Sequence, residues 1–113
     1  MEEKLRILLV EDEEHLAESI SFNLEMEGFE VKHTANGAHV VKIFKGEKFN
    51  LVILDVMLPE MDGFDVCEQI RLHNSHVPVL FLSAKNTSED KITGLKRGAD
   101  DYMTKPFKDR KST

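Results

Sequence analysis

The chain has 113 residues, of which 41% are hydrophobic and 32% are charged, a composition typical of one globular domain with its own core. No apolar run approaches the roughly 18 residues that a membrane-spanning helix needs, and the first residues show no secretory-signal pattern. A net charge of −6 argues against a domain that grips nucleic acid directly, because phosphate contacts need clustered Lys and Arg. We therefore expect a cytoplasmic domain without direct nucleic-acid contact.

Cysteine and histidine give little support to disulfide or zinc chemistry. Cys67 is the single cysteine, so an internal disulfide is excluded, and its place in a helix-like pattern predicts a small buried hydrophobic residue. No histidine has a partner at helical i, i+4 spacing or a neighbouring cysteine, so we expect surface positions rather than a zinc site. These histidines are His15, His33, His39, His73 and His76.

Strand-like and helix-like patterns alternate along the whole chain, which is typical of a parallel sheet covered by helices on both faces. In chain order, the patterns predict a strand over residues 5–10, a helix around 16–24 that ends near Gly28, a strand over 29–34, a helix over 37–45, a strand over 51–55, a helix over 63–72, a strand over 79–83, a helix from Thr87 to about Gly98 and a short strand over 101–104. Three of these strands are continuous apolar runs, as central parallel strands should be.

Right-handed crossovers leave few topologies for this order of elements. The natural one is a doubly wound, flavodoxin-like sheet of five parallel strands in the order 2-1-3-4-5. Ligands of such sheets bind outside the carboxyl ends of the strands, where the strand order reverses between the first and third strands. Glu11 and Asp12 follow the first strand and Asp55 ends the third, so all three acids fall at that place.

Three carboxylates beside a core repel one another unless a cation lies among them. Magnesium binds oxygen ligands and uses one or two carboxylates together with waters and a phosphate. We therefore predict a Mg²⁺ site at Glu11, Asp12 and Asp55.

Two further polar residues end or follow strands at the same edge of the sheet. Ser83 ends the fourth strand and Lys105 follows the fifth, so a hydroxyl and an ammonium group can face the acids. A carboxylate nucleophile, a metal, a hydroxyl and a lysine together favour phosphoryl transfer onto an aspartate, Asp55.

Four segments in this order resemble the receiver domain of bacterial response regulators. They are Glu11-Asp12, Asp55 with the turn over residues 57–63, Leu82-Ser83-Ala84, and residues 98–107. The resemblance is strongest to the OmpR/PhoB branch, in which a receiver precedes a winged-helix DNA-binding domain. It implies a switch that a histidine kinase phosphorylates, coupled to a DNA-binding output domain that lies outside this chain.

The resemblance also implies a role for each site residue. Asp55 accepts the phosphoryl group, and Mg²⁺ is held by Asp12, Asp55 and the backbone carbonyl of Met57, with Glu11 acting largely through water. Ser83 hydrogen-bonds a phosphoryl oxygen and Lys105 pairs with it. Such a domain is a signalling phosphoacceptor that assists its own phosphorylation and dephosphorylation, and is not otherwise an enzyme.

Three residues are expected to shape the response. Tyr102 matches the family's aromatic residue that changes rotamer on activation, although plain packing of a short last strand would also explain it. Met57 and Lys85 lie two residues beyond Asp55 and Ser83, beside the route by which water attacks an acyl phosphate, so they should tune its lifetime.

The chain departs from the family pattern after residue 107. We expect a receiver domain over residues 1–107 and a polar tail over 108–113 in place of the family's fifth helix, because the tail contains no apolar residue. Loss of that helix would expose apolar surface, which favours a marginal monomer and a dimer through the exposed face.

Other functions fit parts of the same pattern. A receiver from a hybrid sensor kinase or phosphorelay would have almost the same sequence. A magnesium-dependent phosphohydrolase of the haloacid-dehalogenase type also uses an aspartate after a strand, but it needs a second acid two residues later, where this chain has Met57. A scaffold without phosphorylation is disfavoured by the complete set of acids, hydroxyl and lysine.

Overall fold

The computed structural model describes residues 4–58, 61–83 and 101–104, with the backbone alone for 83 and 101–104. The elements in chain order are β1 (Arg6–Val10), α1 (Glu14–Met26), β2 (Glu30–Thr34), the 3-10 helix η1 (Gly37–His39), α2 (Val40–Gly46), β3 (Leu51–Asp55), α3 (Gly63–His73), β4 (Val79–Ser83) and β5 (Asp101–Thr104). Within these ranges, no helix has the length and apolar character that crossing a membrane requires. The helix predicted from Thr87 and the polar tail over 108–113 lie outside the described residues.

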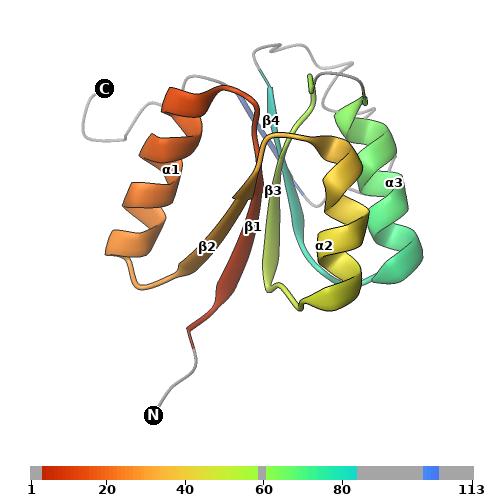
Figure 1. The fold of residues 1–113 in the computed structure, drawn as a ribbon, viewed down its shortest axis with the longest axis horizontal. Coiled ribbons are helices and arrows are strands. Elements are labelled where there is room, and N and C mark those ends of the chain that lie inside the picture. The colour runs from red at the N-terminus through yellow and green to blue at the C-terminus, as the bar shows by residue number, and fades with distance from the viewer. Residues whose placement is uncertain (1–3, 59–60, 84–100, 105–113) are drawn as a thin grey trace.

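All five strands form one parallel sheet in the order β2-β1-β3-β4-β5, as the sequence predicts. Figure 1 shows α1 on one face of this sheet and α2 and α3 on the other. Because β1 and β3 lie side by side with Val10 paired to Leu54, the chain leaves both strands at the same edge of the sheet. This edge is called the carboxyl edge below.

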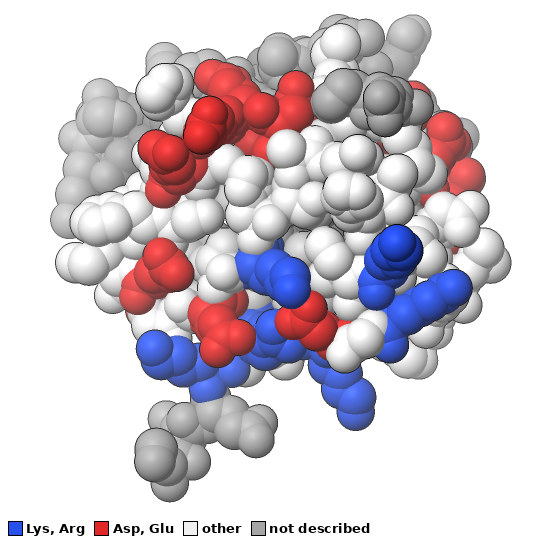
Figure 2. Space-filling view, viewed as in Figure 1, with Lys and Arg blue, Asp and Glu red and all other residues white. Residues whose placement is uncertain are grey.

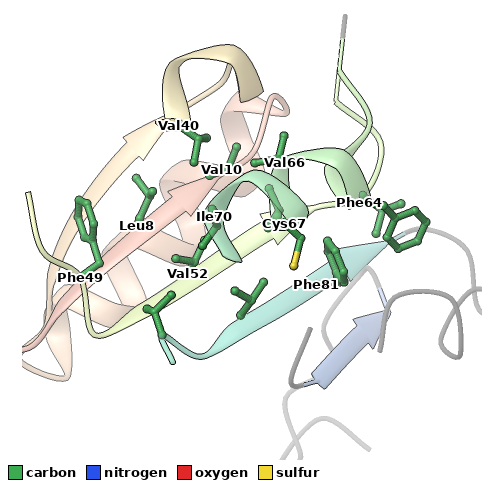
Figure 3. Close-up of a cluster of buried hydrophobic side chains, with 14 residues drawn as sticks. Leu8, Val10, Val40, Phe49, Val52, Phe64, Val66, Cys67, Ile70 and Phe81 are labelled. Atoms are coloured by element: carbon green, nitrogen blue, oxygen red, sulfur yellow. The ribbon is translucent and has the colours of Figure 1, made fainter. Parts of the chain in front are cut away.

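Two hydrophobic layers hold the sheet between its helices. The larger layer, between the sheet and α2 and α3, includes Val52, Ile70 and Phe81, all fully buried (Figure 3). The rings of Phe64 and Phe81 meet edge to face with centroids 5.0 Å apart, a favourable arrangement for aromatic pairs. Cys67 is also fully buried in this layer, which confirms its prediction as a small core residue.

The smaller layer lies between the sheet and α1, whose Ala17 and Ile20 are buried against it. After this helix, Gly28 adopts φ +97°, a left-handed conformation that glycine enters without the Cβ strain of other residues. The turn lets the N–H of Phe29 donate to the carbonyl of Leu24 at 3.1 Å. The chain therefore reverses there and enters β2, close to where the sequence predicts the helix end.

The second helix begins differently from its prediction over residues 37–45. Residues 37–39 form a 3-10 turn, and the α-helix starts only at Val40. The cause is local, because the side-chain oxygen of Asn36 accepts a hydrogen bond from the N–H of Ala38 at 2.8 Å and tightens the first turn.

A charged network ties the opposite edge of the sheet together. Arg6 contacts Glu30 at 2.7 Å and Glu47 at 2.5 Å, Lys32 contacts Glu47 at 2.6 Å, and the Arg6 guanidinium lies 4.8 Å from the centre of the Phe49 ring. The hydrogen bonds from Lys32 and Arg6 lower the pKa of Glu47, and those to Glu47 and Glu30 raise the pKa of Arg6. Figure 2 shows Lys and Arg side chains gathered at the end where β1 begins, whereas a group of acidic side chains lies at the opposite end.

Candidate functional site

Three carboxylates converge at the carboxyl edge of the sheet. Glu11 and Asp12 follow β1, and Asp55 is the last residue of β3. One carboxylate oxygen from each of the three lies within 4.8 Å of the others. The structure therefore brings together the three acids that the sequence predicts as a metal site.

The three acids differ in exposure. Glu11 is fully buried and Asp55 is 3% exposed, and these two are the buried charged residues of the described part of the chain. Asp12 is exposed, so solvent reaches the cluster from its side. Oxygen donors at this spacing, two beneath the surface and one open to water, fit an ion such as Mg²⁺ that keeps part of its hydration shell.

The turn after β3 holds the Asp55 carboxylate in place. The N–H of Met57 donates to Asp55 Oδ1 at 3.0 Å. The N–H of Val56 donates to the Leu82 carbonyl at 2.9 Å, so the backbone beside the acid is still tied to β4. Asp55 thus sits on a rigid strand end with its carboxylate oriented by the backbone two residues later.

The start of α3 packs directly against the strand end that carries Asp55. The Asp62 side chain accepts from the Phe64 N–H at 2.7 Å and caps the helix, and the Gly63 N–H donates to the Val56 carbonyl at 2.8 Å. A Cβ on Gly63 would overlap the Asp55 carbonyl oxygen and lie 2.7 Å from the Val56 Cα. Only glycine fits this close approach.

The side chain, N–H and carbonyl of Glu11 each contact a different residue. Its Oε2 accepts from the Glu13 N–H at 2.9 Å, its N–H donates to the Thr34 carbonyl at 3.1 Å, and its carbonyl lies 2.7 Å from His33 Nε2. His33 is exposed, as the sequence predicts, but its contact with the site was missed. The sequence carries no local signal for it, because the contact joins residues 22 positions apart and depends on the strand register.

The other predicted site residues are only partly placed. Ser83 is the last residue of β4, and Tyr102 lies on β5 opposite Phe81, but the side chains of Ser83 and Tyr102 are outside the described atoms. Lys85 and Lys105 lie outside the described residues. The backbone of Met57 is at the site, and its side chain is 57% exposed.

Comparison with known proteins agrees with this geometry. The family model for the response regulator receiver domain matches residues 7–112. The alkaline phosphatase synthesis transcriptional regulatory protein PhoP of Bacillus subtilis is 46% identical over 105 residues, which are 93% of this chain and 44% of that protein. The chain thus spans less than half the length of this curated relative.

Solved structures share the fold. A Francisella response regulator receiver domain has a TM-score of 0.87 and 31% identity, covering 93% of this chain and 87% of that one. The BeF3-activated receiver domain of Klebsiella pneumoniae RstA has a TM-score of 0.85 and 29% identity, covering 91% and 87%. Both PhoP and RstA are regulators of the OmpR/PhoB family, which confirms the branch predicted from the sequence. The chain therefore belongs to the response regulator receiver domain family.

Proposed function

We propose that Asp55 accepts a phosphoryl group from the phosphohistidine of a partner histidine kinase, with Mg²⁺ bound at Glu11, Asp12 and Asp55. The observation that carries the proposal is the convergence of these carboxylates within 4.8 Å, with Asp55 buried at the end of β3. Membership of the receiver family supports the same role.

In the proposed transfer, an Asp55 carboxylate oxygen forms a bond to phosphorus as the phosphorus–nitrogen bond of the donor breaks and the imidazole leaves. When bound, Mg²⁺ neutralises charge on the phosphoryl oxygens. Asp12 and Asp55 would bind the ion directly with the Met57 carbonyl, and Glu11 would act largely through water. The Met57 N–H keeps the Asp55 carboxylate in one orientation during the transfer.

Ser83 and Lys105 are proposed to bind the phosphoryl oxygens after transfer. The register supports a place for Ser83 near the site, because β4 pairs with β3 and Leu82 lies opposite Asp55. A hydroxyl donor and an ammonium group would replace hydration lost by the phosphoryl group and stabilise its charge.

We further propose that Tyr102 changes rotamer when Ser83 is drawn to the phosphoryl group. Its position on β5, next to β4 in the sheet, supports a coupling between the two residues. The new charge biases a two-state surface that a partner reads.

The output is proposed to be a DNA-binding transcription-factor domain in a cytoplasmic protein. The support is the transcriptional regulatory relative, of which this chain matches only 44%.

The lifetime of the phosphoryl group is proposed to depend on Met57 and Lys85, which would control the approach of water to the acyl phosphate. The support is the position of Met57, whose N–H binds the Asp55 carboxylate while its side chain is exposed.

The test is incubation with Mg²⁺ and acetyl phosphate, followed by intact-protein mass spectrometry. We expect one phosphoryl adduct on the unmodified sequence, none on Asp55→Asn, and an unchanged adduct on Asp65→Asn, which alters an exposed acid of α3. An adduct that persists in Asp55→Asn would overturn the assignment of the acceptor. Rapid multiple turnover of phosphate monoesters would favour the phosphohydrolase instead.

A further inference from the structure

The hydrogen-bond ladder between β1 and β2 ends at the cluster of Glu11, Asp12 and Asp55. Its last backbone rung is the N–H of Glu11 donating to the Thr34 carbonyl at 3.1 Å. In a parallel ladder with this register, the next rung would run from the N–H of Asn36 to the carbonyl of Glu11. The strands part at this point, so that rung has to be replaced.

Side chains engage the groups that would have continued the ladder. The N–H of Asn36 donates to Thr34 Oγ1 at 3.3 Å, and the N–H of Glu13 donates to Glu11 Oε2 at 2.9 Å. The Glu11 carbonyl is within hydrogen-bond distance of the His33 ring, 2.7 Å from Nε2. A ring from β2 therefore stands where the backbone donor of β2 would have been.

The Glu11 carbonyl determines which ring nitrogen of His33 carries a proton in this contact. A carbonyl oxygen only accepts hydrogen bonds, so Nε2 of His33 carries the proton. The hydrogen bond therefore joins the His33 ring of β2 to the backbone that follows β1.

We propose that His33 is a positioning residue that sets the affinity of the carboxylate cluster for divalent cations. His33 contacts the carbonyl of the peptide unit between Glu11 and Asp12. This hydrogen bond fixes the backbone from which both carboxylates extend. Outer contacts that orient ligands influence metal affinity even though they do not touch the ion. This inference rests on the proposed Mg²⁺ site.

The experiment is a MgCl₂ titration of the ¹⁵N-labelled chain followed by NMR. The amide signals of Glu13 and Met57 report the site directly, because these N–H groups donate to the carboxylates of Glu11 and Asp55. The variants are His33→Ala, which removes the donor, and His33→Gln, whose side-chain amide nitrogen can reach the same carbonyl. The matched control is His76→Ala, which alters an exposed histidine between α3 and β4.

We expect His33→Ala to raise the Mg²⁺ dissociation constant about tenfold, the lower end of the effect of outer contacts on metal sites. His33→Gln should recover most of the affinity, and His76→Ala should leave it unchanged. Phosphorylation of His33→Ala by acetyl phosphate should be slow at low Mg²⁺ and return to the original rate at saturating Mg²⁺, since the acceptor itself is intact.

An affinity for His33→Ala within twofold of the original would overturn the inference while leaving the proposed function standing. A loss of folding stability in His33→Ala without rescue of Mg²⁺ affinity by glutamine would equally overturn it, as a purely structural role. If the unmodified chain itself gives no Mg²⁺-dependent shift at Glu13 or Met57, the proposed metal site fails and the inference fails with it.

Discussion

The N–H of Met57 donates to Asp55 Oδ1 at 3.0 Å, so the Asp55 carboxylate is held by the backbone of the residue two positions later. The same residue leaves its side chain 57% exposed beside the site. Met57 therefore combines a backbone role that any residue except proline can fill with a side-chain role that is open to variation.

Replacing Met57 with alanine should shorten the lifetime of the phosphoryl group on Asp55 several-fold. The smaller side chain would give water a wider approach to the acyl phosphate, while the backbone hydrogen bond to Asp55 stays. The free energy of unfolding should change by less than about 0.5 kcal/mol, as for other exposed positions. Loss of the adduct with time, followed by mass spectrometry, measures the rate.

The matched control is Met26→Ala, which removes a 72% exposed methionine from α1. Its phosphoryl lifetime should equal that of the unmodified chain. An unchanged or longer lifetime in Met57→Ala would contradict the role given to the side chain.

Replacing Gly63 with alanine should destabilise the fold by about 1–3 kcal/mol, the usual effect of forcing a methyl group into packed structure. The new Cβ would overlap the Asp55 carbonyl and crowd Val56. Urea denaturation measures the free energy of unfolding. Gly46→Ala is the control, because its Cβ would meet no atom within 4 Å at the end of α2. It should be neutral or stabilising by up to about 1 kcal/mol, and equal losses in the two variants would argue against the packing account.

The network around Glu47 should make stability depend on pH. Hydrogen bonds from Lys32 and Arg6 lower the pKa of Glu47 from its ordinary value of 4.5. A carboxyl with a lowered pKa in the folded state contributes stability above pH 4.5, and that contribution is lost as the pH falls through the lowered value. Glu47→Gln should therefore reduce the urea midpoint near neutral pH and have a shrinking effect in acid. Glu18→Gln, an exposed acid of α1, should show no such trend, and a difference for Glu47→Gln that persists in strong acid would contradict the ionic origin.

Asp12→Asn should stabilise the metal-free fold by about 1 kcal/mol, because it removes one of three neighbouring negative charges. The same change should abolish the stabilisation by Mg²⁺, which for the unmodified chain amounts to about 2.7 kcal/mol at a hundred times the dissociation constant. Thermal unfolding with Mg²⁺ and with EDTA measures both effects.

Glu14→Gln is the control, because it removes a nearby acid that is not part of the carboxylate cluster. Glu14 lies in the first turn of α1, where a negative charge favours the helix, so its loss should cost about 0.3–1 kcal/mol. If both variants lower the stability of the metal-free chain, repulsion within the carboxylate cluster is not significant.

Most of the fold could be predicted from strong local patterns in the sequence. The apolar runs predicted β1 and β3, and the carboxylates at their carboxyl ends predicted the cluster, because parallel strands end at a common edge. The end of α1 near Gly28 also followed from local chemistry, since glycine enters the left-handed turn freely.

Two further features were not predicted from the sequence. The 3-10 start at Gly37 is a local one, because the Asn36 side chain accepts the Ala38 N–H and tightens the first turn. The other depends on residues that are distant in the sequence. The contact between His33 and the Glu11 carbonyl exists only because the β1 and β2 register brings them together. The roles of Lys85 and Lys105 stay predictions, because both lie outside the described residues.

The close packing of Gly63 on Asp55 has a mechanical consequence. The end of β3 and the beginning of α3 are joined by a hydrogen bond and by contact too close for any side chain. Sliding α3 away from the strand would break both contacts, so we expect α3 to stay in place if Asp55 is phosphorylated as proposed. Under the proposed function, we therefore expect the displacement that a partner senses to arise on the other side of Asp55, where β4 and β5 complete the sheet, with α3 as the fixed support.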